Sequence, residues 1–154
     1  MDTRKAINKA KCLRKQYFTD GICNPRDAFE RIFNDKNIEL QYNDDGEGIY
    51  QDKDGKWILT IPLTSSPLRD NFTIAHEIGH LELHDTKRTQ QFHRSGKPTS
   101  EEIEANIFAA EFLMPEDEFK EAAKRFNNSE RMLASYFGVS PAAALVRMTV
   151  LRIK

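Results

Sequence analysis

The stretch DNFTIAHEIGHLELH, residues 70–84, most constrains the fold because it combines a metal-binding spacing with the apolar pattern of a buried helix. His76 and His80 are one helical turn apart and match H-E-x-x-H, in which two histidines share a metal ion. Glu77 between them is placed to act as a general base on a water molecule at that metal. A motif with only three fixed positions occurs by chance in many proteins, so its specificity here depends on the rest of the helix.

One polar arc runs along this predicted helix. At about 100° per residue, the arc covers roughly 100° of the circumference, and almost all of the remainder is apolar. Its members are Thr73, His76, Glu77, His80 and His84. A helix that is apolar nearly all round is buried, so this arc indicates a cleft-facing site rather than histidines that only satisfy internal hydrogen bonds. Gly79 predicts close approach of another element, and Asp70 or Asn71 is the expected N-cap.

Length and charge narrow the class of protein. The chain of 154 residues favours one domain, with or without a small appendage, and a net charge of −1 provides no general attraction to nucleic acid or anionic membranes. No apolar run is long enough to cross a bilayer, and the charged amino terminus lacks a signal-peptide core. We therefore expect a cytoplasmic protein without a membrane partner, whose two cysteines are free thiols. The sequence does not indicate an oligomeric state.

Hydrophobic periodicity predicts an α+β fold. Strands are expected in a small antiparallel three-stranded sheet packed on helices, at residues 38–42, 48–51 and 56–61. Helices are expected at residues 3–18, 24–35, 70–84, 100–113, 115–126, 129–137 and 141–153. We divide the chain into a core at residues 1–115 and a helical module at residues 116–154.

The metal site requires a third protein ligand. His84 lies about 9 Å along the helix axis from the midpoint of the other two histidines, which is too far for a shared ion. Thr86 occupies the position of the third histidine in the longer form of the motif, so that form is excluded. A carboxylate from a separate helix remains.

The helix predicted at residues 100–113 offers such a carboxylate. Three of its glutamates share one face: Glu101, Glu104 and Glu111. Glu104 is favoured because it is flanked by apolar residues and needs a partner there, although an exposed or ion-paired glutamate is the alternative. Glu102 is assigned instead to a capping box with Thr99 at the helix start.

The segments FTIAHEIGHLELH and EIEANIFAAEFLMP together resemble the ImmA/IrrE family of zinc metallo-endopeptidases, over residues 69–115. The resemblance implies a minimal zincin-like fold in which His76, His80 and Glu104 bind zinc, with manganese or iron as alternatives. It implies Glu77 as the catalytic base. It also implies a protein substrate in the bacterial cytoplasm: a helix-turn-helix repressor encoded nearby, whose cleavage relieves repression of a mobile element or stress regulon.

Substrate contacts are less well defined by the sequence. An oxyanion donor is expected, and His84 on the polar arc is the first candidate, followed by His93 and Tyr50. The resemblance to zincins implies that the strand at residues 57–61 is an exposed edge that pairs with an extended substrate, and an interior strand is the alternative.

The last two predicted helices, around ASYFGVSPAAALVRM, have the pattern of a helix-turn-helix. DNA binding by a regulator with a structural or vestigial metal is therefore an alternative function. However, the second helix opens with Pro141 and three alanines, which offer no base-reading side chains, and Arg147 would at best reach a phosphate. We prefer a packing or substrate-docking module without direct DNA binding. A scaffold that binds its partner without cutting it is a third possibility, but it would have no need of Glu77.

Overall fold

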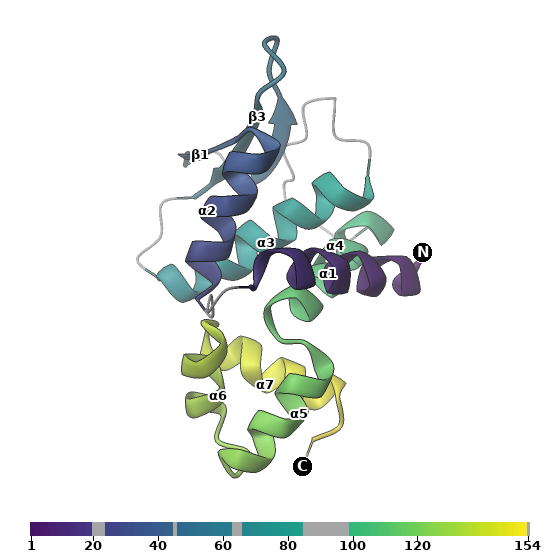
Figure 1. Cartoon of the computed structure of the whole chain (residues 1–154), viewed down its shortest axis with the longest axis vertical. Helices are drawn as coiled ribbons and strands as arrows, with labels where there is room; N and C mark the ends of the chain where they lie inside the picture. Colours follow the sequence, from purple (N-terminus) through teal and green to yellow (C-terminus); the bar gives the residue numbers. More distant parts are fainter. Residues whose placement is uncertain (20–23, 45, 63–65, 85–98, 154) are drawn as a thin grey trace.

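The computed structural model describes residues 1–19, 24–44, 46–62, 66–84 and 99–153. Its helices are α1 (Thr3–Tyr17), α2 (Pro25–Lys36), α3 (Pro67–Leu83), α4 (Ser100–Leu113), α5 (Glu116–Arg125), α6 (Glu130–Phe137) and α7 (Pro141–Val150). Its strands are β1 (Ile38–Tyr42), β2 (Gly48–Gln51) and β3 (Trp57–Ile61). The predicted α+β class is confirmed. In Figure 1, α3 crosses the middle of the molecule, with the sheet above it and α5–α7 below.

The sheet is mixed, so the prediction of an all-antiparallel sheet is wrong. The strand order is β1-β3-β2, in which β3 runs parallel to β1 and antiparallel to β2. A tight turn at residues 52–55 joins β2 to β3, where the Asp52 and Lys56 backbones are hydrogen-bonded. The most apolar strand takes the central position, because β3 has four consecutive buried residues while β1 ends exposed. Residues 57–61 are therefore interior and not an edge.

Helix α3 begins three residues earlier than expected. Ser66 is the N-cap, its hydroxyl accepts from the Arg69 amide, and Pro67 occupies the first turn, where a missing N–H has no cost. The expected N-cap Asn71 instead joins separate elements: its amide donates to the Gly138 carbonyl and accepts from Arg26. Burial extends along most of the helix, from Asp70 to His80, so the expectation of a buried helix is confirmed.

Helix α4 packs closely on α3. A Cβ atom placed on Gly79 would lie 3.0 Å from Cδ1 of Phe108, which confirms that the glycine permits this approach. Phe108 is fully buried and stacks on Phe112, whose ring in turn stacks on Phe29 of α2. The core therefore fixes the distance between the two helices that carry the polar arc and the candidate glutamates.

Helices α5–α7 form the lower part of the molecule (Figure 1). Arg147 of α7 connects them to α4: its guanidinium is 2.9 Å from the Glu111 carboxylate and its Nε donates to the Met114 carbonyl. The Arg147 side chain is buried, so it has no access to a phosphate, contrary to the role considered above. The division at residue 115 stays a prediction.

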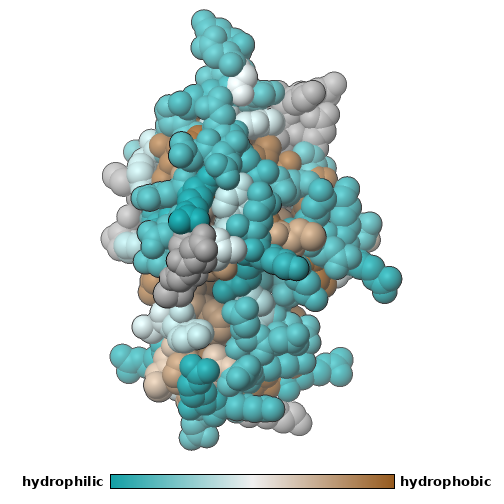
Figure 2. Space-filling view, in the orientation of Figure 1, coloured by the Kyte–Doolittle hydropathy of each residue, from teal (hydrophilic) through white to brown (hydrophobic). Residues whose placement is uncertain are grey.

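The exposed surface is largely hydrophilic on the face in Figure 2, with hydrophobic side chains near the junction of the upper and lower parts. The large exposed apolar residues of α6 and α7 are Met132, Tyr136, Leu145, Val146 and Val150. No single described helix is long and apolar enough to cross a membrane. Helices α6 and α7 reach that length only together, with a bend of 105° between them.

Candidate metal centre

Helix α3 supplies three polar side chains to one buried point. His76 and His80 are each 1% exposed and Glu77 is fully buried. The spacing of four residues places the two imidazoles on one face of the helix, where they meet edge to face with ring centroids 4.8 Å apart. The apolar remainder of the helix packs into the core, so the polar arc is held away from bulk water.

Glu102 of α4, not Glu104, completes this cluster. Its Oε2 atom is 2.7 Å from Nε2 of His76 and 3.6 Å from Nε2 of His80, and the two nitrogens are 3.2 Å apart. Glu102 follows the N-cap Thr99 by three residues, and its amide donates to the Thr99 hydroxyl as a capping box requires. Its side chain, however, points to the histidines instead of returning to the cap.

Glu104, which the sequence predicted as the third ligand, contacts other residues. Two residues along a helix rotate a side chain by about 200°, so Glu102 and Glu104 point to different sides of α4. The Glu104 carboxylate accepts from the backbone amide of Asp2, and its Oε1 is 2.8 Å from Nε2 of His84. Two hydrogen bonds lower the pKa of Glu104 below its usual value: that from the Asp2 amide has the larger effect, and that from His84 the smaller one. The structure therefore does not bring Glu104 to His76 and His80.

The hydrogen bonds define which nitrogen of each imidazole is available. Nδ1 of His76 is 2.7 Å from the amide oxygen of Asn106, which only accepts, so in the neutral imidazole Nδ1 carries the proton and Nε2 has a lone pair. Burial, followed by the neighbouring His76, lowers the pKa of His80 to about 4. His80 is therefore neutral near pH 7, the state in which an imidazole binds metal.

The donor set fits a divalent cation. An unprotonated Nε2 of His76 would repel the Glu102 carboxylate oxygen 2.7 Å away, and a cation bound between the two atoms would remove that repulsion. Tetrahedral zinc with ligand distances of about 2.0–2.1 Å separates its ligand atoms by roughly 3.3 Å. The three separations of 2.7, 3.2 and 3.6 Å bracket that value. Two histidines and a carboxylate also leave one coordination position for a reacting molecule, as catalytic zinc sites do.

The structure also bears on the oxyanion candidates. Both nitrogens of His84 have partners: Nδ1 is 3.1 Å from Nδ1 of His80, and Nε2 contacts the Glu104 carboxylate. Tyr50 lies half-buried on β2. His93 lies outside the described residues.

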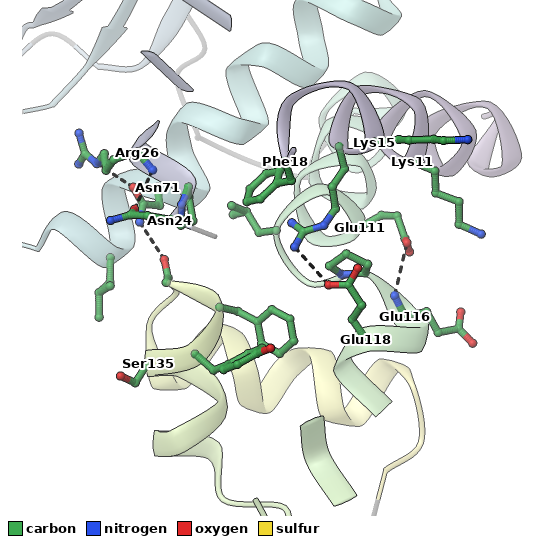
Figure 3. Close-up of a pocket in the computed structure, with 18 of the residues that line it drawn as sticks. Lys11, Lys15, Phe18, Asn24, Arg26, Asn71, Glu111, Glu116, Glu118 and Ser135 are labelled. Atoms are coloured by element: carbon green, nitrogen blue, oxygen red, sulfur yellow. Dashed lines mark hydrogen bonds and ion pairs between the residues drawn. The ribbon is translucent and has the colours of Figure 1, made fainter. Parts of the chain in front are cut away.

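A large cavity in the described part of the chain lies away from the metal centre. It has a volume of about 1180 Å³ and lies between α1, the start of α3 and α5–α6. Arg14 and Glu118, which both line it, form an ion pair. Figure 3 shows the Arg26–Asn71 hydrogen bond in the same cavity. None of the metal-centre residues lines it, so the cavity does not reach the cluster.

A buried H-E-x-x-H helix joined by a glutamate from the next helix defines a domain of the metallopeptidase class. The sequence model of the IrrE N-terminal-like domain, a peptidase family, matches residues 27–149, and the chain belongs to this family. The resemblance to the ImmA/IrrE family is thereby confirmed.

Two further comparisons agree. The chain is 35% identical over 100 residues to the radiation response metalloprotease IrrE of Deinococcus radiodurans. That match covers 60% of this chain and 30% of the relative, so the chain spans less than a third of the relative's length. A solved structure of a Mycobacterium tuberculosis transcriptional regulator has the same fold, with a TM-score of 0.68 and 19% identity. The fold similarity covers 95% of this chain and 47% of the regulator.

Proposed function

We propose that this chain is a cytoplasmic zinc-dependent endopeptidase that cleaves a regulatory protein, a helix-turn-helix repressor encoded nearby, and so relieves repression. The observation that carries the proposal is the meeting of His76, His80 and Glu102 at separations that suit a metal, next to a buried Glu77. Membership of a peptidase family supports proteolysis, and the choice of a repressor as substrate rests on the ImmA/IrrE family.

Each residue has a distinct part in this reaction. The Nε2 atoms of His76 and His80 and a carboxylate oxygen of Glu102 would hold the ion. When bound there, zinc would polarise the scissile carbonyl and make a water molecule more acidic. Glu77 would accept the proton of that water and deliver it to the leaving amine as the peptide bond breaks.

The sheet offers a place for an extended substrate. Among the described residues β2 pairs only with β3, so its other edge has main-chain groups able to pair with a peptide. Strand β2 also contacts α3, whereas the other edge strand, β1, lies against α2. We therefore assign substrate pairing to β2 instead of β3.

The test is incubation of the zinc-loaded protein with the purified repressor encoded beside its gene. We expect discrete fragments by mass spectrometry, none after chelation, and restored cleavage after zinc is returned. Glu77→Gln is the matched control, because it keeps the ligands and the shape of the side chain. A parent protein that binds no zinc, or a Glu77→Gln variant that cuts equally well, would overturn the proposed function.

The DNA-binding alternative gains no support from the C-terminal helices. Arg147 is committed to Glu111 and Met114, and the first turn of α7 consists of Pro141 and alanines. Sequence-specific recognition needs side chains that reach base edges, and this turn has none.

A further inference from the structure

A continuous line of hydrogen bonds runs from the metal centre to the first residues of the chain. Nδ1 of His80 is 3.1 Å from Nδ1 of His84, and Nε2 of His84 is 2.8 Å from Oε1 of Glu104. The second oxygen of Glu104 accepts from the backbone amide of Asp2, immediately before α1. The line therefore connects a candidate ligand on α3 with α4 and α1.

The backbone explains how His84 reaches both partners. His84 is the C-cap of α3, with extended φ and ψ of −129° and 161°, while its amide still donates to the His80 carbonyl at 2.9 Å. Because the helix ends at His84, the imidazole does not have to point in the direction that a further helical turn would impose. The side chain is 9% exposed and that of Glu104 is 14% exposed, so both bonds are largely shielded from water.

The direction of each bond follows from the chemistry of the groups. A carboxylate accepts, so Nε2–H of His84 donates to Glu104, and in the neutral imidazole Nδ1 of His84 is left with a lone pair. That lone pair accepts the Nδ1–H of His80, which leaves Nε2 of His80 unprotonated and facing His76 and Glu102. The line thereby selects the tautomer of His80 that can bind a metal.

We propose that His84 and Glu104 are positioning residues, which fix the tautomer and ring orientation of His80 and so set the affinity of the centre for zinc, with Glu104 held in place by the Asp2 amide. This inference rests on the proposed function, in that His80 is taken to be a zinc ligand. It gives both residues roles different from the oxyanion contact and third ligand predicted from the sequence. Partners of metal-binding histidines typically contribute 10–100-fold to metal affinity.

The experiment measures zinc affinity by competition with a chromophoric chelator, which needs no substrate. His84→Phe keeps a ring of similar size but removes both hydrogen bonds, and we expect it to weaken zinc binding by about 10–100-fold. Glu104→Gln should lose less, because its amide oxygen still accepts from His84. Glu101→Gln is the matched control on the same helix, where the side chain is exposed, and should bind zinc as the parent does.

Two measurements distinguish a positioning role of these residues from a general packing role. The double variant His84→Phe, Glu104→Gln should bind zinc no more weakly than His84→Phe alone, because both changes act through one line of bonds. Melting of the metal-free proteins should be similar for parent and variants. Unchanged zinc affinity in His84→Phe, with the parent binding zinc, would overturn the inference and leave the proposed function standing. A parent that binds no zinc would overturn both.

Discussion

Oε2 of Glu102 lies 2.7 Å from Nε2 of His76, although the two residues belong to different helices and are separated by residues 77–101 of the chain. The contact sits at the first turn of α4, where the exposed amides of the helix end favour a negative charge. Packing of α4 on α3 through Gly79 brings the two helices close enough for it. This relationship distinguishes Glu102 from every other glutamate of α4.

Glu102→Gln should therefore lower zinc affinity by more than the roughly 10–100-fold expected for a partner outside the ligand set. The amide keeps the size of the side chain but removes the charge that balances the ion. Chelator competition measures the change, with Glu104→Gln compared under the same conditions. The ligand assignment is wrong if Glu104→Gln binds zinc more weakly than Glu102→Gln.

Glu77→Gln should retain zinc and lose about 10²–10⁴ in cleavage rate, the range usual for a general acid–base group. The side chain of Glu77 is fully buried on α3 between the two histidines. Glutamine has nearly the same size and shape, so it fits there without rearrangement. Single-turnover cleavage of the repressor measures the rate, and metal content is measured on the same preparation. Loss of zinc together with activity would mean that Glu77 supports the site and does not act on the water.

Local patterns allowed much of the fold to be predicted. Asn24 caps α2 with Pro25 in its first turn as expected, since both signals act within a few residues. The arc of His76, Glu77 and His80 needed only helical periodicity, and the role of Gly79 followed from the absence of a side chain in a helix interior. These features depend on neighbours along the chain.

The place of Glu102 beside the two histidines and the strand order depend on partners that are distant in the sequence. Glu102 satisfied the capping pattern with Thr99 so well that its side chain was assigned to the helix start, while its real direction depends on how α4 meets α3. The small residues Ala105 and Ala109 follow it at intervals of three and seven, which marks the face of α4 that packs closely. The spacing of that face, instead of the apolar flanks of Glu104, indicates that Glu102 lies beside the histidines.

Gly79→Ala should destabilise the fold by about 1 kcal/mol. Alanine gains about 1 kcal/mol of helix propensity, but overpacking a tight core typically costs 1–3 kcal/mol. The new Cβ would lie 3.0–3.2 Å from three atoms of Phe108, which is itself stacked on Phe112 and has little room to shift. Urea unfolding gives the free energy.

The double variant Gly79→Ala, Phe108→Leu tests the cause of this loss. Removing the ring should make the alanine less harmful than it is in the parent background, so the two changes should be non-additive. A stabilising effect of Gly79→Ala alone would show that α4 shifts enough to accommodate the methyl group.

Arg147→Met should cost about 3–5 kcal/mol of unfolding free energy, because it leaves the Glu111 carboxylate buried without its partner. The side chains are only 9% and 5% exposed, and the pair joins α7 to α4. Adding Glu111→Gln to Arg147→Met should recover part of the loss, since the uncompensated charge is then removed. Lys120→Met is the matched control: its pair with Glu116 has a similar distance of 2.7 Å, but both side chains are 47% exposed. An exposed pair contributes about 0–1 kcal/mol to the free energy of unfolding. A loss of only that amount in Arg147→Met would show that the buried pair does not hold α7 to α4.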